Sequence, residues 1–155
     1  MFRVVLWEPE IPPNTGNLMR LTVNTGCDLH LIEPLGFPLD DARMRRAGLD
    51  YKEFADVTVH PNYDAFVEDV EPQRVFAYTQ HASRRYTDVA FRSGDVLLFG
   101  RESDGLSSEI LEHASVTDRL RIPIAPGGRS LNLANAAAIA VYEAWRQHDF
   151  AGVER

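Results

Sequence analysis

The sequence predicts an α/β fold built on one largely parallel sheet flanked by helices. Short apolar segments alternate with short helical patterns along the chain, and glycine, proline and asparagine punctuate the junctions. At 155 residues the chain has the size of one domain, and a domain of that size buries roughly 70% of its unfolded surface. There is no internal repeat, low-complexity tract or linker, so residues 1–155 are predicted to form a single domain.

The predicted strands are apolar runs bounded by turn residues, as expected for strands that are covered on both faces. They comprise residues 2–8, 28–34, 56–60, 74–79, 95–100 and 120–125.

The predicted helices fall between these strands and have recognisable ends. Gly26 suits the left-handed residue that ends a helix over 14–26, and Asn62 suits the cap of a helix over 62–70. Further helices are predicted over 40–48 and 107–114, and an alanine-rich helix follows Asn132 near the C-terminus.

The charge composition limits the kinds of partner that the protein is expected to bind. A net charge of −7 argues against indiscriminate binding to a polyanion, although Arg43, Arg45, Arg46 and the pair Arg84-Arg85 form local basic clusters. Each cluster taken alone is more typical of a solvated surface.

The cysteine and histidine content predicts neither a disulfide framework nor a metal site. Cys27 is the only cysteine, which fits a reducing compartment, and the five histidines are scattered without ligand spacing. No apolar run reaches the roughly 20 residues of a membrane span, and the N-terminal run is too short for a signal peptide. We therefore expect a soluble, cytoplasmic protein that holds no metal.

Four polar turns each follow a predicted strand, and ligands in open parallel sheets bind at the carboxyl ends of strands. None contains a dinucleotide fingerprint, an NTP phosphate loop or the serine elbow of a hydrolase. The turns comprise residues 8–20, 78–85, 99–106 and 126–132.

Single residues in these turns allow two interpretations. Gly100 permits a close approach of backbone to a ligand, yet Gly100 and Glu102 alone also suit an ordinary strand-turn-helix junction. Asn14 and Asn17 suit helix capping. Arg20, expected near the start of the predicted helix, opposes the helix dipole, so an anionic partner explains it better.

Three segments in order, "PNTGNLMRL", "LLFGRESDGL" and "RIPIAPGGRSLNLANAAAIAVYEAWRQ", resemble the motifs of the SPOUT-class RNA ribose 2'-O-methyltransferases. With "EPEIPPNTGN" and "RRAGLDY", residues 2–147 resemble the minimal, single-domain group that methylates the tRNA wobble nucleotide, the TrmL (YibK) group. The resemblance implies the α/β knot fold, with a C-terminal trefoil knot that the usual rule against threaded chains would not predict.

The resemblance also implies an activity. The expected enzyme transfers a methyl group from S-adenosyl-L-methionine to the ribose 2'-hydroxyl of nucleotide 34, cytidine or modified uridine, with leucine tRNAs as expected substrates. The alternatives are methylation of another tRNA or rRNA position, methylation of a base, and a non-catalytic RNA-binding module with a vestigial pocket. The resemblance requires no metal.

Site residues follow from the matched motifs. The implied cofactor contacts, many of them through backbone groups, are Tyr78, Thr79, Gly100, Glu102, Ile122, Ile124, Ser130, Leu131 and Asn135. The implied catalytic residue is Arg20, as a proton acceptor or as a phosphate clamp, followed by Tyr142, Ser130 and Asn132. The implied RNA-binding residues are Asn17, Arg20, Arg43, Arg46 and Arg129.

Two positions depart from the pattern of the group. Arg101 stands where some relatives have proline, which predicts either a change in loop rigidity or a phosphate contact, and Tyr78 replaces a smaller apolar residue. Larger members have a separate RNA-binding domain, so this chain is expected to bind tRNA through the catalytic domain itself, as a homodimer.

The C-terminal helix predicts the dimer contact. Two apolar stripes at helical spacing cover most of its surface, and such a helix must be covered on most sides. Burial in one core and contact with a second chain both satisfy this pattern, and the resemblance favours the second, with Tyr142 near the shared site. The stripes are Ala134, Ala138, Val141 and Trp145, and Leu133, Ala137, Ala140 and Ala144.

Overall fold

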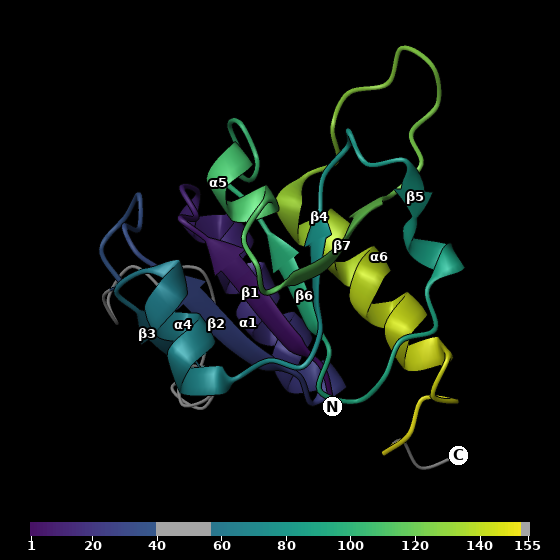
Figure 1. Ribbon diagram of the computed structural model, residues 1–155, viewed down its shortest axis with the longest axis horizontal. Coiled ribbons are helices and arrows are strands. Elements are labelled where there is room, and N and C mark those ends of the chain that lie inside the picture. Colours follow the sequence, from purple (N-terminus) through teal and green to yellow (C-terminus); the bar gives the residue numbers. More distant parts are fainter. Residues whose placement is uncertain (40–56, 153–155) are drawn as a thin grey trace.

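The computed structural model describes residues 1–39 and 57–152, and they form one seven-stranded, fully parallel sheet (Figure 1). The strand order is β3-β2-β1-β6-β4-β7-β5. The strands are β1 (Arg3–Trp7), β2 (Asp28–Ile32), β3 (Val57–His60), β4 (Val75–Tyr78), β5 (Arg84–Arg85), β6 (Val96–Phe99) and β7 (Val116–Arg121).

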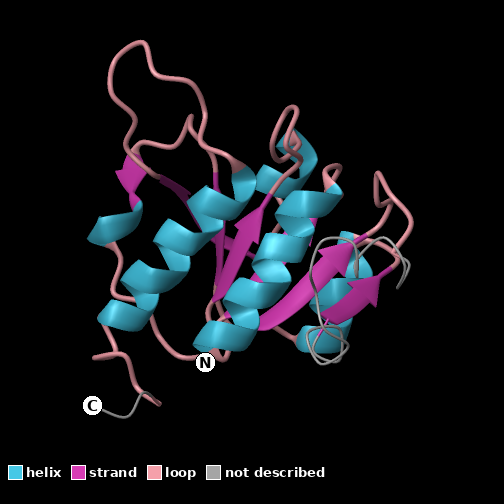
Figure 2. Cartoon of the chain, turned by 180° about the vertical axis from the view of Figure 1, so that it is seen from behind, coloured by secondary structure: helices cyan, strands magenta, loops and turns pink. Residues whose placement is uncertain are grey.

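Helices cover both faces of the sheet. Figure 2 shows α1 (Pro12–Thr25) and α6 (Leu133–Arg146) side by side on one face. The short helices α4 (Tyr63–Val70) and α5 (Ser108–Leu111) lie on the other, and a 3-10 turn, η1 (Tyr86–Asp88), follows β5.

The two faces bury separate cores because side chains alternate along each strand. On β1, Val4 belongs to the core beneath α1 and α6, whereas Val5 belongs to the core beneath α4 and α5. All four residues of β4 and of β6 are buried, as a strand covered on both faces requires.

Most predicted elements are confirmed, including two of their ends. Gly26 has φ 66° and ends α1, and the Asn62 side chain accepts a hydrogen bond from the Ala65 backbone N–H at 2.8 Å. The expected knot is a matter of threading and stays a prediction. The helix predicted over 40–48 lies outside the described residues.

Two predictions around β7 are wrong. The apolar run 120–125 was expected to be a strand, but β7 ends at Arg121 and the rest of the run enters a loop. The Arg84-Arg85 pair, expected in a loop, forms the edge strand β5. A strand of two charged residues has no apolar signature.

The position expected for Arg20 also needs correction. Helix α1 begins at Pro12, with both prolines in its first positions, so Arg20 lies in the middle of the helix. The dipole argument for an anionic partner therefore fails, because helix-dipole effects are confined to the terminal turns.

The apolar stripes of α6 are buried within the single chain. Ala137, Ala140 and Ala144 are fully buried against α1 and the sheet, and Ala138 is the one stripe residue that is only partly buried. The prediction that these stripes form an interface between chains is wrong for the buried residues. The exposed face of α6 presents Ile139 and Tyr142 instead.

Within the described residues, no helix is both long and apolar enough to cross a bilayer. The same residues contain no group of three or more His, Cys, Asp or Glu side chains placed to hold a metal ion.

Candidate active site

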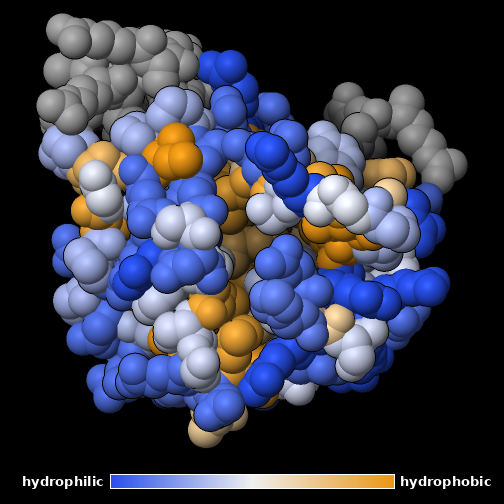
Figure 3. All heavy atoms as spheres, turned by 90° about the horizontal axis from the view of Figure 1, so that it is seen from above, coloured by the Kyte–Doolittle hydropathy of each residue, from blue (hydrophilic) through white to orange (hydrophobic). Residues whose placement is uncertain are grey.

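A cavity of about 520 Å³ opens at the carboxyl ends of β4, β6 and β7. Figure 3 views the molecule from this end and shows hydrophobic side chains in a central hollow bordered by hydrophilic ones. The lining residues come from all four predicted turns and from the chain on either side of the last turn: Ile11, Asn14, Tyr78, Thr79, Gln80, His81, Phe99, Gly100, Arg101, Glu102, Ser103, Asp104, Gly105, Ile122, Ile124, Ser130, Leu131, Asn132, Leu133 and Ala136.

Two aromatic rings line the cavity between β4 and β6. Tyr78 and Phe99 stack with their centroids 4.6 Å apart. The Tyr78 hydroxyl is buried without a hydrogen-bond partner among the described residues, and burial raises its pKa well above the usual range. Because the phenol stays protonated at neutral pH, Tyr78 cannot serve there as a base.

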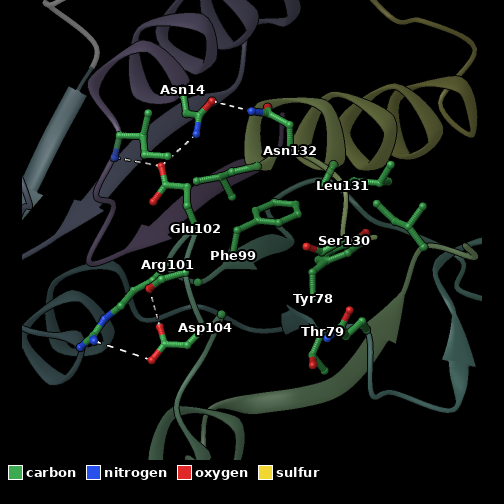
Figure 4. A pocket seen from close by; sticks show the side chains of 18 of the residues that line it. Asn14, Tyr78, Thr79, Phe99, Arg101, Glu102, Asp104, Ser130, Leu131 and Asn132 are labelled. Carbon is green, nitrogen blue, oxygen red and sulfur yellow. Dashed lines mark hydrogen bonds and ion pairs between the residues drawn. The ribbon is translucent and has the colours of Figure 1, made fainter. Parts of the chain in front are cut away.

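A hydrogen-bonded node joins three of the turns, and Figure 4 shows its central contacts. The Glu102 carboxylate accepts hydrogen bonds from the backbone N–H groups of Glu10 (2.8 Å) and Ile11 (3.2 Å) and from the Asn14 side chain (3.1 Å). Asn14 in turn accepts a hydrogen bond from the Asn132 side chain at 2.8 Å. We call Glu102, Asn14 and Asn132 the Glu102 node.

The node also fixes the start of α6. Asn132 caps that helix, because its side-chain oxygen accepts from the Ala134 and Asn135 N–H groups at 2.9 and 3.3 Å. Asn14 is buried inside the first turn of α1 and does not cap it, contrary to the interpretation from sequence. The node thus connects the starts of α1 and α6 to the loop after β6.

That loop is a tight hairpin. Arg101 and Gly105 exchange backbone hydrogen bonds of 3.1 and 3.0 Å. A Cβ on Gly100 would lie 2.1 Å from the Gly105 carbonyl carbon and 2.2 Å from the Leu106 nitrogen. Gly100 is therefore required by the hairpin itself, and a larger side chain there would meet backbone before it met a ligand.

The Arg101 side chain holds the hairpin to the end of β1. Its guanidinium pairs with Glu8, lies 4.7 Å over the Trp7 ring and approaches Asp104 at 3.9 Å. Two carboxylates already neutralise this cation, so the geometry supports the predicted role in loop rigidity over the predicted phosphate contact.

The cavity includes most of the residues expected to contact the cofactor. Of the nine, Asn135 alone is not a lining residue, since it lies on the exposed side of α6 with its N–H bonded to the cap. The lining residues are Tyr78, Thr79, Gly100, Glu102, Ile122, Ile124, Ser130 and Leu131.

The expected catalytic residues divide into two groups. Ser130 and Asn132 line the cavity, whereas Arg20 and Tyr142 are exposed on α1 and α6 and do not line it. Of the expected RNA-binding residues, Asn17 and Arg129 are exposed, and Arg43 and Arg46 lie outside the described residues. Their roles stay predictions.

Sequence reasoning missed Asn14, Phe99 and His81 as lining residues. Phe99 and His81 stand in the turns already singled out, so the position after a strand was the available signal. The partners of Asn14 lie 88 and 118 residues away, and no local pattern predicts such pairing.

Comparison with known proteins identifies the family that has this architecture. The model of the SpoU rRNA methylase family matches residues 1–142. The chain belongs to the SpoU methylase family. A tRNA (cytidine(34)-2'-O)-methyltransferase of Burkholderia cenocepacia is 59% identical to it over 154 residues, which cover 98% of this chain and 99% of that protein.

Solved structures of SpoU-family and related methyltransferases superpose on the chain. A structure described as giving insights into 2'-OH methylation of C/U34 on tRNA has a TM-score of 0.87 at 44% identity, covering 96% of this chain and 97% of that one. The SpoU methyltransferase AviRb of Streptomyces viridochromogenes, in complex with AdoMet, has a TM-score of 0.80 at 25% identity, covering 95% and 57%.

Proposed function

We propose that this SpoU-family chain transfers a methyl group from S-adenosylmethionine to the ribose 2'-hydroxyl of nucleotide 34 of tRNA, cytidine or uridine. The observation that supports it most is the Glu102 node, which joins all the matched motifs at one cavity. Full-length similarity to proteins named for that reaction supports nucleotide 34 as the target and its 2'-oxygen as the methylated atom.

The residues present fit the cofactor. A cavity of about 520 Å³ lies within the range of small-molecule sites, and its apolar side chains suit an adenine ring. Polar groups suited to the ribose and the amino acid portion stand beside them, on Thr79, Ser130 and the backbone of the hairpin. Ile122, Ile124 and Leu131 supply apolar surface.

S-adenosylmethionine supplies an electrophilic methyl group on a sulfonium, so this chain must align the hydroxyl and accept its proton. Glu102 is engaged by three donors and holds the hairpin in place, which makes it a positioning residue. Arg20 acts on the RNA side, either on the hydroxyl or on the adjacent phosphate. A guanidinium with a pKa above about 12 is a poor base at neutral pH, which favours the phosphate.

We further propose that the enzyme acts as a homodimer in the cytoplasm and that leucine tRNAs are its substrates. The exposed Ile139 and Tyr142 on α6 support a contact between chains on that face. The single, unpaired Cys27 supports a reducing compartment.

The dimer is tested by Ile139→Glu, which places like charges across a two-fold contact while leaving the buried side of α6 intact. Sedimentation should show a dimer for the wild type and a monomer for the variant. The matched change Ala140→Glu should instead unfold the chain, because Ala140 is fully buried within it. A wild-type protein that is monomeric and fully active would contradict the proposal.

Transfer of labelled methyl groups to total tRNA and to rRNA tests the substrate. We expect label in tRNA alone, in a nuclease-resistant dinucleotide that maps to position 34, and strongest in leucine isoacceptors. Label in rRNA or at another tRNA position would favour the first alternative. RNA binding without transfer would favour a vestigial module.

A further inference from the structure

Two arginines face each other across the edge of the sheet beside the cavity. The register of β5 and β7 places Arg85 directly opposite Arg121, one step after the pair Arg84 and Leu120. Side chains of register partners point to the same face of a sheet, so two like charges stand side by side. Like charges opposite each other on neighbouring strands repel, and an anion bound between or above them would offset that repulsion.

A third arginine shares that face. Leu120 is buried in the core beneath α1 and α6, so its neighbours Arg119 and Arg121 point to the face of α5. The contact of the Arg119 Nε with the Leu111 carbonyl of α5, at 3.0 Å, confirms this orientation. We call Arg85, Arg119 and Arg121 the edge arginine cluster, and all three are exposed.

The cluster differs from the other arginines of this edge. Arg84, next in sequence, pairs with Asp118 at 2.6 Å and donates to the Asp88 carbonyl at 2.9 Å. Neither Arg85 nor Arg121 forms an ion pair within the described residues, in a chain whose net charge is −7. Charged residues protect edge strands from aggregation, but either sign or a mixture would do that, whereas both residues of the edge strand β5 are arginines.

The cluster borders the cavity along two stretches of chain. Arg121 directly precedes Ile122, which lines the cavity, and Arg85 follows the lining residue His81 after a short turn. In Figure 1, β5 lies at the foot of the long loop that connects β7 to α6. A polyanion that places one nucleotide in the cavity would bring neighbouring phosphates over this edge.

We propose that the edge arginine cluster binds phosphate groups of the RNA substrate next to the methylated nucleotide. This inference rests on the proposed function and adds a surface to it. Guanidinium groups match phosphate oxygens in geometry, and phosphate contacts fix the register of a nucleic acid without selecting its sequence. The cluster therefore contributes to tRNA affinity and its salt dependence, and it leaves the cofactor site unchanged.

The test is the double variant Arg85→Gln/Arg121→Gln, in the full chain with unmodified tRNA. Each lost phosphate contact should reduce the slope of log K against log salt by roughly 0.7 to 0.9. We expect the tRNA dissociation constant and KM to rise about tenfold at moderate salt, with the slope reduced by about 1.5. The turnover at saturating tRNA and the affinity for S-adenosylhomocysteine should not change.

The matched control is Arg92→Gln. Arg92 is also exposed but precedes β6, at the opposite end of the strands from the cavity, so its loss should change neither KM nor the slope. The variant Arg85→Lys/Arg121→Lys should recover most of the salt dependence, because the point charges survive. Thermal unfolding of Arg85→Gln/Arg121→Gln should show no loss of stability, since that variant removes a repulsive pair of charges.

Unchanged binding and slope in a folded double variant would overturn the proposal, as would a rise in KM with an unaltered slope. These results differ from failure of the proposed function, in which the wild type transfers no methyl group to tRNA. If the wild type transfers no methyl group, tRNA binding measured without cofactor, in wild type and double variant, still tests the role of the cluster.

Discussion

Two polar clusters lie on opposite sides of β1, the partly buried Glu102 node and a buried histidine pair, and they differ in how fully their polar atoms are hydrogen-bonded. In the Glu102 node, both carboxylate oxygens of Glu102 and both polar side-chain atoms of Asn132, Oδ1 and Nδ2, are hydrogen-bonded. In the histidine pair between β2 and β3, His30 Nδ1 and His60 Nε2 lie 3.0 Å apart, and the buried Nε2 of His30 has no partner among the described residues.

The difference separates a cluster that organises the site from one that limits stability. The node connects turns that are far apart in sequence, so its loss should disturb the cavity. The histidine pair packs its rings against Phe66 and one another within the core, away from the cavity lining. Its effect should be on folding, and only where pH protonates it.

The largest expected effect is that of Gly100→Val, beside the node. Its Cβ would overlap hairpin backbone at 2.1 Å, and backbone cannot move aside as a flexible side chain does. We expect a loss of at least about 3 kcal/mol in the free energy of unfolding, measured by urea titration. A variant of wild-type stability that merely fails to bind S-adenosylhomocysteine would show that the glycine serves the ligand instead.

The substitution Glu102→Gln should reduce both activity and stability. It keeps the shape of the side chain but exchanges one acceptor oxygen for a donor that faces backbone N–H groups. We expect kcat/KM to fall about 100-fold, as for misplaced reacting groups, and stability to fall by about 1 to 3 kcal/mol. Equal kcat/KM in wild type and variant would show that the Glu102 node does not contribute to catalysis.

The histidine pair should make stability depend on pH without affecting turnover at neutral pH. Burial, and then the neighbouring His60, lower the pKa of His30 from 6.5 to about 4, while Asp28 and Asp69 oppose the shift and Arg3 adds to it. The unfolded chain therefore binds more protons between pH 6.5 and 4, so stability falls as pH falls through that window. The loss should approach about 3 kcal/mol by pH 4.

The double variant His30→Leu/His60→Leu tests this effect. Removing both partners together avoids leaving one of them buried and unpaired. Urea titrations from pH 7 to 4 should show a smaller loss of stability than in the wild type, with methyl transfer at pH 7 retained. An identical pH dependence in both proteins would assign acid sensitivity to other groups.

The sequence predicts the parts of this molecule that depend on local patterns. Strand alternation, the left-handed Gly26 and the Asn62 cap are decided by near neighbours, and the structure reproduces them. The position of the site after three neighbouring strands of the sheet was also predicted from the sequence, because parallel strands bring their carboxyl ends together.

Features set by distant contacts could not be predicted in the same way. The apolar residues Ile122 and Ile124 suggest a strand but line the cavity, while the more polar β7 is held in place by β4 and β5. The stripes of α6 showed that it is covered, yet only the structure shows that α1 and the sheet cover it. The matched motif indicated Glu102 as a cofactor contact. Only the structure shows that its carboxylate accepts hydrogen bonds from donors in a turn far away in sequence.

The most direct test of the proposed reaction compares two tRNAs that differ at one atom. The wild-type enzyme is given a wobble-cytidine tRNA and the same tRNA with a 2'-deoxycytidine at position 34, together with labelled S-adenosylmethionine. Both should bind with similar affinity, and only the ribose form should accept a methyl group. Equal methylation of the two would place the methyl group on a base or another nucleotide and would contradict the account.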